Sequence, residues 1–156
     1  MKRLFIIIIC LQALLLMAER SASTIVNFSV PDIQHIVLDN DALTMNLEYS
    51  GNTQRLYDPV VINRTYDIVS TGSFKRLVAQ LNYNMPEFTT LEVKADAPAN
   101  AVSLGYVSLS VAPTPIVTNI SNVNQKNLLL YFKLNAKLGA PISINENRVI
   151  TFTIMD

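Results

Sequence analysis

The chain has 156 residues, half of them apolar, and its 12 basic and 12 acidic residues give a formal net charge of zero. The apolar content argues against a disordered chain, and the balanced charge lacks the basic excess that nucleic acids and anionic membranes attract. The length suits a single domain with a hydrophobic core of its own.

The start of the chain has the three parts of a cleavable export signal in the right order. Lys2 and Arg3 form the positive start, an apolar stretch follows, and residues 21–23 are a small-residue cleavage site. A retained membrane anchor is the alternative, but the apolar run falls short of the ~20 residues that cross a bilayer and contains Gln12. We therefore predict a cleaved, helical signal peptide over residues 1–23.

Cleavage has consequences for the mature chain, residues 24–156. The single cysteine, Cys10, lies in the signal, so the mature chain has no disulfide and must be stabilised by its core. We reject a lipid anchor at Cys10 because Ile9 stands where a small residue is needed. The remaining 9 basic and 11 acidic residues leave a charge near −2. We expect no binding to nucleic acid and no membrane insertion after cleavage.

The mature chain is predicted to be one all-β domain, because short runs of β-branched and aromatic residues alternate with Pro, Gly, Asn and Asp. In chain order the predicted strands cover residues 25–30, 35–38, 43–49, 59–62, 65–69, 74–83, 90–95, 106–111, 116–120, 128–136 and 148–154. The last is the clearest, since Ile150, Phe152 and Ile154 share one face. The pattern favours an immunoglobulin-like antiparallel β-sandwich.

One segment is ambiguous between strand and helix. Phe74, Leu77, Val78 and Leu81 have the i, i+3, i+4, i+7 spacing of an amphipathic helix. We predict a strand here because the neighbouring segments are extended. Residues 113–115, Pro-Thr-Pro, are interpreted as a crossing between sheets or the end of an edge strand.

The residue types that catalysis and metal binding require are scarce. Triad catalysis needs a histidine base, and the chain has only His35, which an alternating strand places on the face opposite Ile36 and Leu38. One histidine cannot supply a zinc, copper or iron site, and residues 39–41, Asp-Asn-Asp, favour a turn over a calcium site. We therefore predict a protein that is not an enzyme, with no catalytic residue, no metal site and no cofactor.

Tyrosines and the first predicted strand are the candidates for binding. Tyr49, Tyr57, Tyr66 and Tyr83 could stack on sugars or anchor a protein partner, but we favour a structural role for them in half-buried strands. In residues 24–30, Val26, Phe28 and Val30 share one face, which suits a strand of the domain's own sheet or a strand lent to a neighbouring subunit. We favour self-completion, with self-association through residues 24–30 as the alternative.

Short phrases along the mature chain resemble small exported proteins of Bacteroidetes-type bacteria. These phrases are residues 25–33, 36–39, 74–81, 91–95 and 149–154. More distantly, the cysteine-free body and the strand–proline–strand opening are similar to the major subunits of colonisation-factor-type fimbriae. That resemblance implies immunoglobulin-like sandwiches that complete one another with donated N-terminal strands. The ending, residues 153–156, differs from the Gly-rich, Tyr-bearing closing strand of those subunits.

These features predict a non-catalytic exported protein with a structural or adhesive role, such as a fimbria-like surface subunit. A monomeric binding module for a glycan or an envelope protein is the alternative. Either protein would be periplasmic, attached to the cell surface or extracellular.

Overall fold

The computed structural model describes residues 25, 27–39, 42–48, 50–51, 57–140 and 146–156. The expected signal peptide, Tyr49 and residues 40–41 therefore lie outside the described residues. Contacts between residues divide the chain into two units, Met1–Val30 and Pro31–Asp156, and each is considered by itself.

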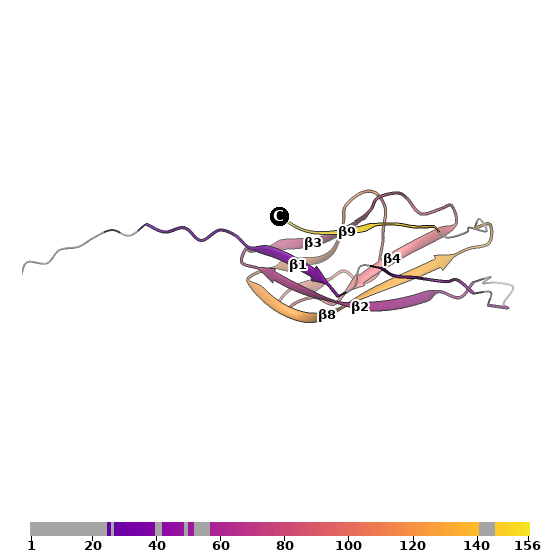
Figure 1. The fold of residues 1–156 in the computed structure, drawn as a ribbon, viewed down its shortest axis with the longest axis horizontal. Helices are drawn as coiled ribbons and strands as arrows, with labels where there is room; N and C mark the ends of the chain where they lie inside the picture. The colour runs from indigo at the N-terminus through magenta and orange to yellow at the C-terminus, as the bar shows by residue number, and fades with distance from the viewer. Residues whose placement is uncertain (1–24, 26, 40–41, 49, 52–56, 141–145) are drawn as a thin grey trace, which may run out of the picture. The chain divides into compact units, whose positions relative to one another are not determined.

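The second unit is a sandwich of two antiparallel sheets (Figure 1). The five-stranded sheet has the order β1-β2-β8-β4-β6, with bounds β1 Gln34–Leu38, β2 Val60–Ser70, β8 Val123–Ala136, β4 Thr89–Ala95 and β6 Val107–Ser108. The four-stranded sheet has the order β5-β7-β3-β9, with bounds β5 Val102–Ser103, β7 Thr114–Ile120, β3 Lys75–Leu81 and β9 Ile150–Met155. The predicted all-β class and the sandwich are confirmed.

Most predicted strands are found, and the exceptions are specific. The predicted strands at 59–62 and 65–69 are a single strand, β2, and the strand predicted at 106–111 is reduced to the two residues of β6. The predicted strands at 25–30 and 43–49 are wrong for their described residues, none of which lies in a strand. The short strand β5 was not predicted. The stiff Pro-Thr-Pro segment leads into β7, whose Pro115 stands opposite Val78 of β3.

The ambiguous segment is strand β3, as predicted. Leu77, Ala79 and Leu81 alternate along it and are buried against the opposite sheet. Phe74 does not join this face: its backbone has a φ of 58°, its side chain is 77% exposed, and its N–H donates to Ser121 Oγ at 2.8 Å. The apolar face of a helix therefore does not form: residues 75–81 are extended, and the Phe74 side chain points into solvent.

A β-bulge in β8 explains why only the second half of this strand was predicted. Against β2, Tyr66 stands opposite Leu128 but Ile68 stands opposite Gln125, so β8 has an extra residue between these pairs. Asn127, at φ 59°, accommodates it and donates its N–H to Asp67 Oδ1 at 2.9 Å. The bulge moves the buried positions from odd to even numbers, which breaks a simple alternation in the sequence.

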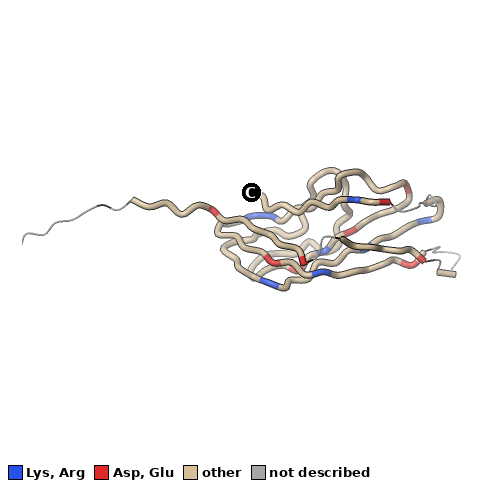
Figure 2. Tube along the Cα trace, in the orientation of Figure 1, with Lys and Arg blue, Asp and Glu red and all other residues tan. Residues whose placement is uncertain are grey.

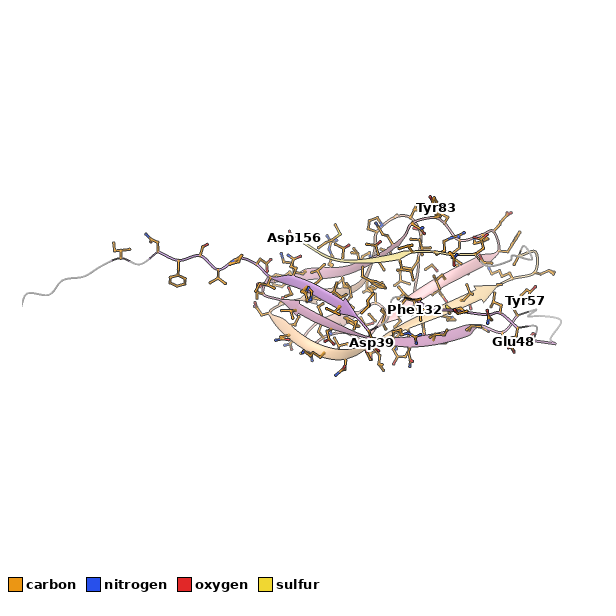
Figure 3. All side chains as sticks on the ribbon, in the orientation of Figure 1. Asp39, Glu48, Tyr57, Tyr83, Phe132 and Asp156 are labelled. Atoms are coloured by element: carbon orange, nitrogen blue, oxygen red, sulfur yellow. The ribbon has the colours of Figure 1, made fainter. Side chains whose placement is uncertain are left out.

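The core lies between the sheets, where the side chains of both layers fill the space around Phe132 (Figure 3). Strands β1 and β9 are the edges of their sheets, and they lie near each other on one side of the sandwich. In the described part of the chain there is no helix long and apolar enough to cross a membrane.

Candidate functional site

A pocket of about 270 Å³, lined by both apolar and charged residues, lies within the sandwich near the edge strands β1 and β9. Its lining comes from β1, the segment after β1, β2, β4, β8, the β3–β4 connection, β9 and the residues before β9. The apolar lining residues are Leu38, Leu43, Met45, Met85, Leu91, Leu130, Phe132, Leu134, Val149, Ile150 and Phe152. We call this pocket the β1/β9 groove.

Aromatic and branched side chains form the floor of the groove. Phe132 of β8 meets Phe152 of β9 edge to face, with ring centroids 6.3 Å apart and an interplanar angle of 80°. Leu91 and Leu130 are buried beside them. The groove is slightly smaller than the ~300–1,000 Å³ usual for small-molecule sites, so it suits a few apolar side chains better than a large ligand.

The groove also contains three charged residues, and two of them form an ion pair. Arg148 Nη1 lies 2.5 Å from Glu146 Oε2, and the Arg148 guanidinium also donates to the carbonyls of Asn84, at 3.1 Å, and Asn147, at 2.9 Å. The pair is anchored at the entrance to β9, where Val149 N–H donates to Asn82 Oδ1 at 3.0 Å. These charges therefore have partners within the domain.

Arg64 is the third charged residue, and it stands on the inward face of β2. Tyr66 and Ile68 share this face and belong to the core. The Arg64 Nη1 donates to the carbonyl of Asn63 at 3.0 Å. Its Nε is shielded from solvent and has no hydrogen-bond partner among the described residues. Sequence reasoning missed Arg64, although a cation between the apolar positions of a strand is a signal that could have been used.

The first unit offers apolar side chains that are not covered. Ile25 is 88% exposed, Phe28 86% and Val30 76%, and none of them belongs to a strand. Chains normally bury most of their aromatic and branched side chains, so three large exposed ones close together in the sequence are a notable feature of the first unit.

An ionic cluster anchors the start of the second unit. Lys75 Nζ lies 3.0 Å from Asp32 Oδ2 and also pairs with the Asp156 carboxylate, while Thr71 Oγ1 donates to Asp32 Oδ1 at 2.9 Å. Hydrogen bonds from Gln34, Lys75 and Thr71 lower the pKa of Asp32 to about 2, and those to Asp156 and Asp32 raise the pKa of Lys75. The cluster ties the residues before β1 to β3 and to the end of β9.

The residues that the sequence singled out do not come together. His35 is exposed on β1, on the face opposite Ile36 and Leu38, as predicted. Tyr66 is buried and its hydroxyl donates to the Asp96 carbonyl at 2.6 Å, so its predicted structural role is confirmed. Tyr83, by contrast, is 69% exposed. Among the described residues there is no group of three or more His, Cys, Asp or Glu that could hold a metal ion.

Charged side chains are dispersed over the described part of the sandwich, and Figure 2 shows both signs along the same strands. On the outer face of the five-stranded sheet, Lys133 pairs with Glu92 at 3.0 Å and covers the ring of Tyr106, while Lys94 covers that of Tyr131. These cations are engaged within the sheet.

Comparison with protein-family models, with curated proteins and with solved structures found no match. The groove, the exposed segment and Arg64 are therefore the basis for a functional proposal.

Proposed function

We propose that this chain is a non-catalytic, exported structural subunit that self-associates. In this proposal residues 24–30 of one copy enter the β1/β9 groove of a neighbouring copy. Residues 1–23 would serve as the export signal, and the mature subunit would act at the cell surface or elsewhere outside the inner membrane. The distant resemblance to fimbrial subunits agrees with such a role.

The observation that carries the proposal is the match between an uncovered segment and an open groove. Phe28 and Val30 are exposed, and by sequence Val26 shares their face. The groove is lined by eleven apolar residues, and two of them, Ile150 and Phe152, belong to the edge strand β9. A strand added beside β9 would bond to its main chain and place alternate side chains in the groove.

The chain just before β1 favours a neighbouring copy over the same copy. Residues 31–33, at the start of the second unit, contain no turn. Ile33 is fixed to Thr71 by two hydrogen bonds, of 2.8 and 3.0 Å, and Asp32 is held by Lys75. A segment that entered the groove of its own domain would have to reverse direction directly before these anchors.

Burial of the side chains of Val26, Phe28 and Val30 in the groove supplies a driving force for association. Each contributes about 1.5–3 kcal/mol when it is fully buried, and the main-chain bonds of an added strand contribute further. The contact between copies is heterologous, because a segment meets a groove. Such contacts form rings or open filaments.

Sedimentation velocity of residues 24–156 over a range of concentrations tests the proposal. The wild-type chain should form oligomers or filaments. Phe28→Asp should sediment as a monomer, because a carboxylate would have to be buried in the apolar groove, and we expect its association to weaken by at least about a hundredfold.

Tyr83→Asp is the matched control, because it places the same charge at another exposed aromatic residue. This variant should assemble as the wild type does. A wild-type chain that stays monomeric at all concentrations, or oligomers that persist in Phe28→Asp, would overturn the proposal. A wild-type chain that stays monomeric would favour the alternative, a monomeric binding module.

A further inference from the structure

The Arg64 side chain is the one feature of the groove that an apolar occupant does not explain. Its Nε is shielded from solvent and lacks a hydrogen-bond partner in the described part of the chain. Arg148, in the same groove, has its guanidinium bonded to Asn84, Asn147 and Glu146. The difference sets Arg64 apart from the other cation of the groove.

An unpaired donor in this position has a measurable cost. A buried polar group without a partner loses its bonds to water and gains nothing in exchange, and the penalty is larger for a charged group. Native structures contain few such atoms, and each requires an explanation. Because Arg64 lines the groove, the missing acceptor can come from whatever fills the groove.

We infer that Arg64 is a specificity-determining residue, which donates its Nε–H to an oxygen atom of the segment inserted from the neighbouring copy. The inference rests on the proposed function, since it names a contact within the same groove. The acceptor is uncharged: residues 24–30 contain no Asp or Glu.

Two oxygen sources satisfy this chemistry. The face that Val26, Phe28 and Val30 present has no side-chain acceptor, so a main-chain carbonyl is one source. Thr24 has the same parity and shares this face, so its hydroxyl is the other. In either case Arg64 fixes how far the segment lies along the groove. If the acceptor is the Thr24 hydroxyl, Arg64 also discriminates against a segment with an apolar side chain at that place.

The experiment uses a chain that can accept a segment but cannot donate one. Residues 24–156 carrying Phe28→Asp serve as the acceptor, and a fluorescent peptide of residues 22–31 serves as the probe, with binding followed by anisotropy. The acceptor is compared with versions that also carry Arg64→Met or Arg64→Lys. A peptide carrying Phe28→Asp is the control for binding in the groove.

We expect Arg64→Met to weaken peptide binding by about tenfold to a hundredfold, the loss of a hydrogen bond to a charged group. The same change should leave the stability of the peptide-free acceptor unchanged or higher, because it removes an unpaired buried atom. A merely structural role for Arg64 predicts instead that Arg64→Met lowers the stability of the peptide-free acceptor, with no specific loss of peptide affinity. Arg64→Lys should weaken binding too, since it keeps the charge but lacks a donor at the Nε position.

The outcomes separate the two proposals. No binding of the peptide to the acceptor with Arg64 intact would overturn the proposed function. Binding of normal strength to Arg64→Met, or full affinity in Arg64→Lys, would overturn only the role of the Arg64 hydrogen bond. If a Thr24→Val peptide binds more weakly and no longer distinguishes Arg64 from Met, the acceptor is the hydroxyl. If it still distinguishes them, the acceptor is a carbonyl.

Discussion

Phe74 is the residue whose backbone conformation is hardest to reconcile with its side chain. A bulky residue at a φ of 58° is strained, and its ring gains little from the fold because it is 77% exposed. Asparagine adopts this conformation more easily. The position therefore carries a cost that a substitution can remove.

We predict that Phe74→Asn raises the free energy of unfolding by about 1 kcal/mol. Urea denaturation measures the change. Phe74→Ala is the control, because it removes the same ring but keeps a residue that disfavours positive φ. If Phe74→Asn is no more stable than Phe74→Ala, the positive φ at this position does not lower the stability of the wild type.

Tyr66 shows how one buried hydroxyl contributes to the core. Its bond to the Asp96 carbonyl should make Tyr66→Phe less stable by about 1 kcal/mol at neutral pH. Burial raises the pKa of Tyr66 above its ordinary value of 10.0, so its contribution is complete below pH 10 and is lost as the pH rises further.

Denaturation at pH 7 and at pH 11 measures both effects. The stability of Tyr66→Phe should fall less between these two values than that of the wild type. The exposed Tyr83, changed to Phe, should leave both measurements as they are. Equal losses in the wild type and in Tyr66→Phe would contradict this account of the alkaline range.

At the scale of elements, the Asp32–Lys75–Asp156 cluster connects the approach to β1 with β3 and β9. The pKa of Asp32 lies near 2, below its ordinary value of 3.8, so its contribution to stability is present above pH 3.8 and is lost as the pH falls toward 2. Asp32→Asn should lower stability at pH 6 and flatten its dependence on pH between 4 and 2. A pH profile parallel to that of the wild type would refute this.

Gly72 makes room for the same cluster. A Cβ at this position would collide with Lys75 Cε and lie 2.8 Å from Asp32 Oδ2, so Gly72→Ala must displace both side chains. We expect a loss of about 1 kcal/mol or less in thermal or urea denaturation, because the displaced atoms lie at the ends of two side chains that can move apart. In Asp32→Asn the further cost of Gly72→Ala should be smaller, because the displaced ion pair is already weakened.

The sequence predicted those elements whose alternation is regular, such as β9 and the second half of β8. It divided β2 into two strands because Asn63 and Arg64 interrupt the apolar pattern, yet Arg64 faces inward. The first half of β8 could not be predicted from a regular alternation, because the bulge at Asn127 shifts the buried positions by one residue. The groove could not be predicted, because it depends on how the edges of two sheets meet.

The proposed assembly joins the exposed segment of one copy to the groove of another. The segment 24–30 was predicted to be a strand, and its described residues form none. A pattern of alternating apolar residues indicates a strand but not the sheet that it joins. Self-completion and donation therefore have the same sequence signature.

Because the chain has no cysteine after residue 10, introduced thiols can test directly whether residues 24–30 of one copy enter the groove of another. Two separately tagged forms of residues 24–156 are mixed, one carrying Phe28→Cys and the other Leu43→Cys in the groove, and a short bis-maleimide reagent joins neighbouring thiols. If residues 24–30 are donated between copies, a covalent product that contains both tags will form. Tyr83→Cys in place of Leu43→Cys should give little of this product. Donation between copies would be contradicted if the mixture gave no product with both tags, while a chain carrying both cysteines was cross-linked only within itself.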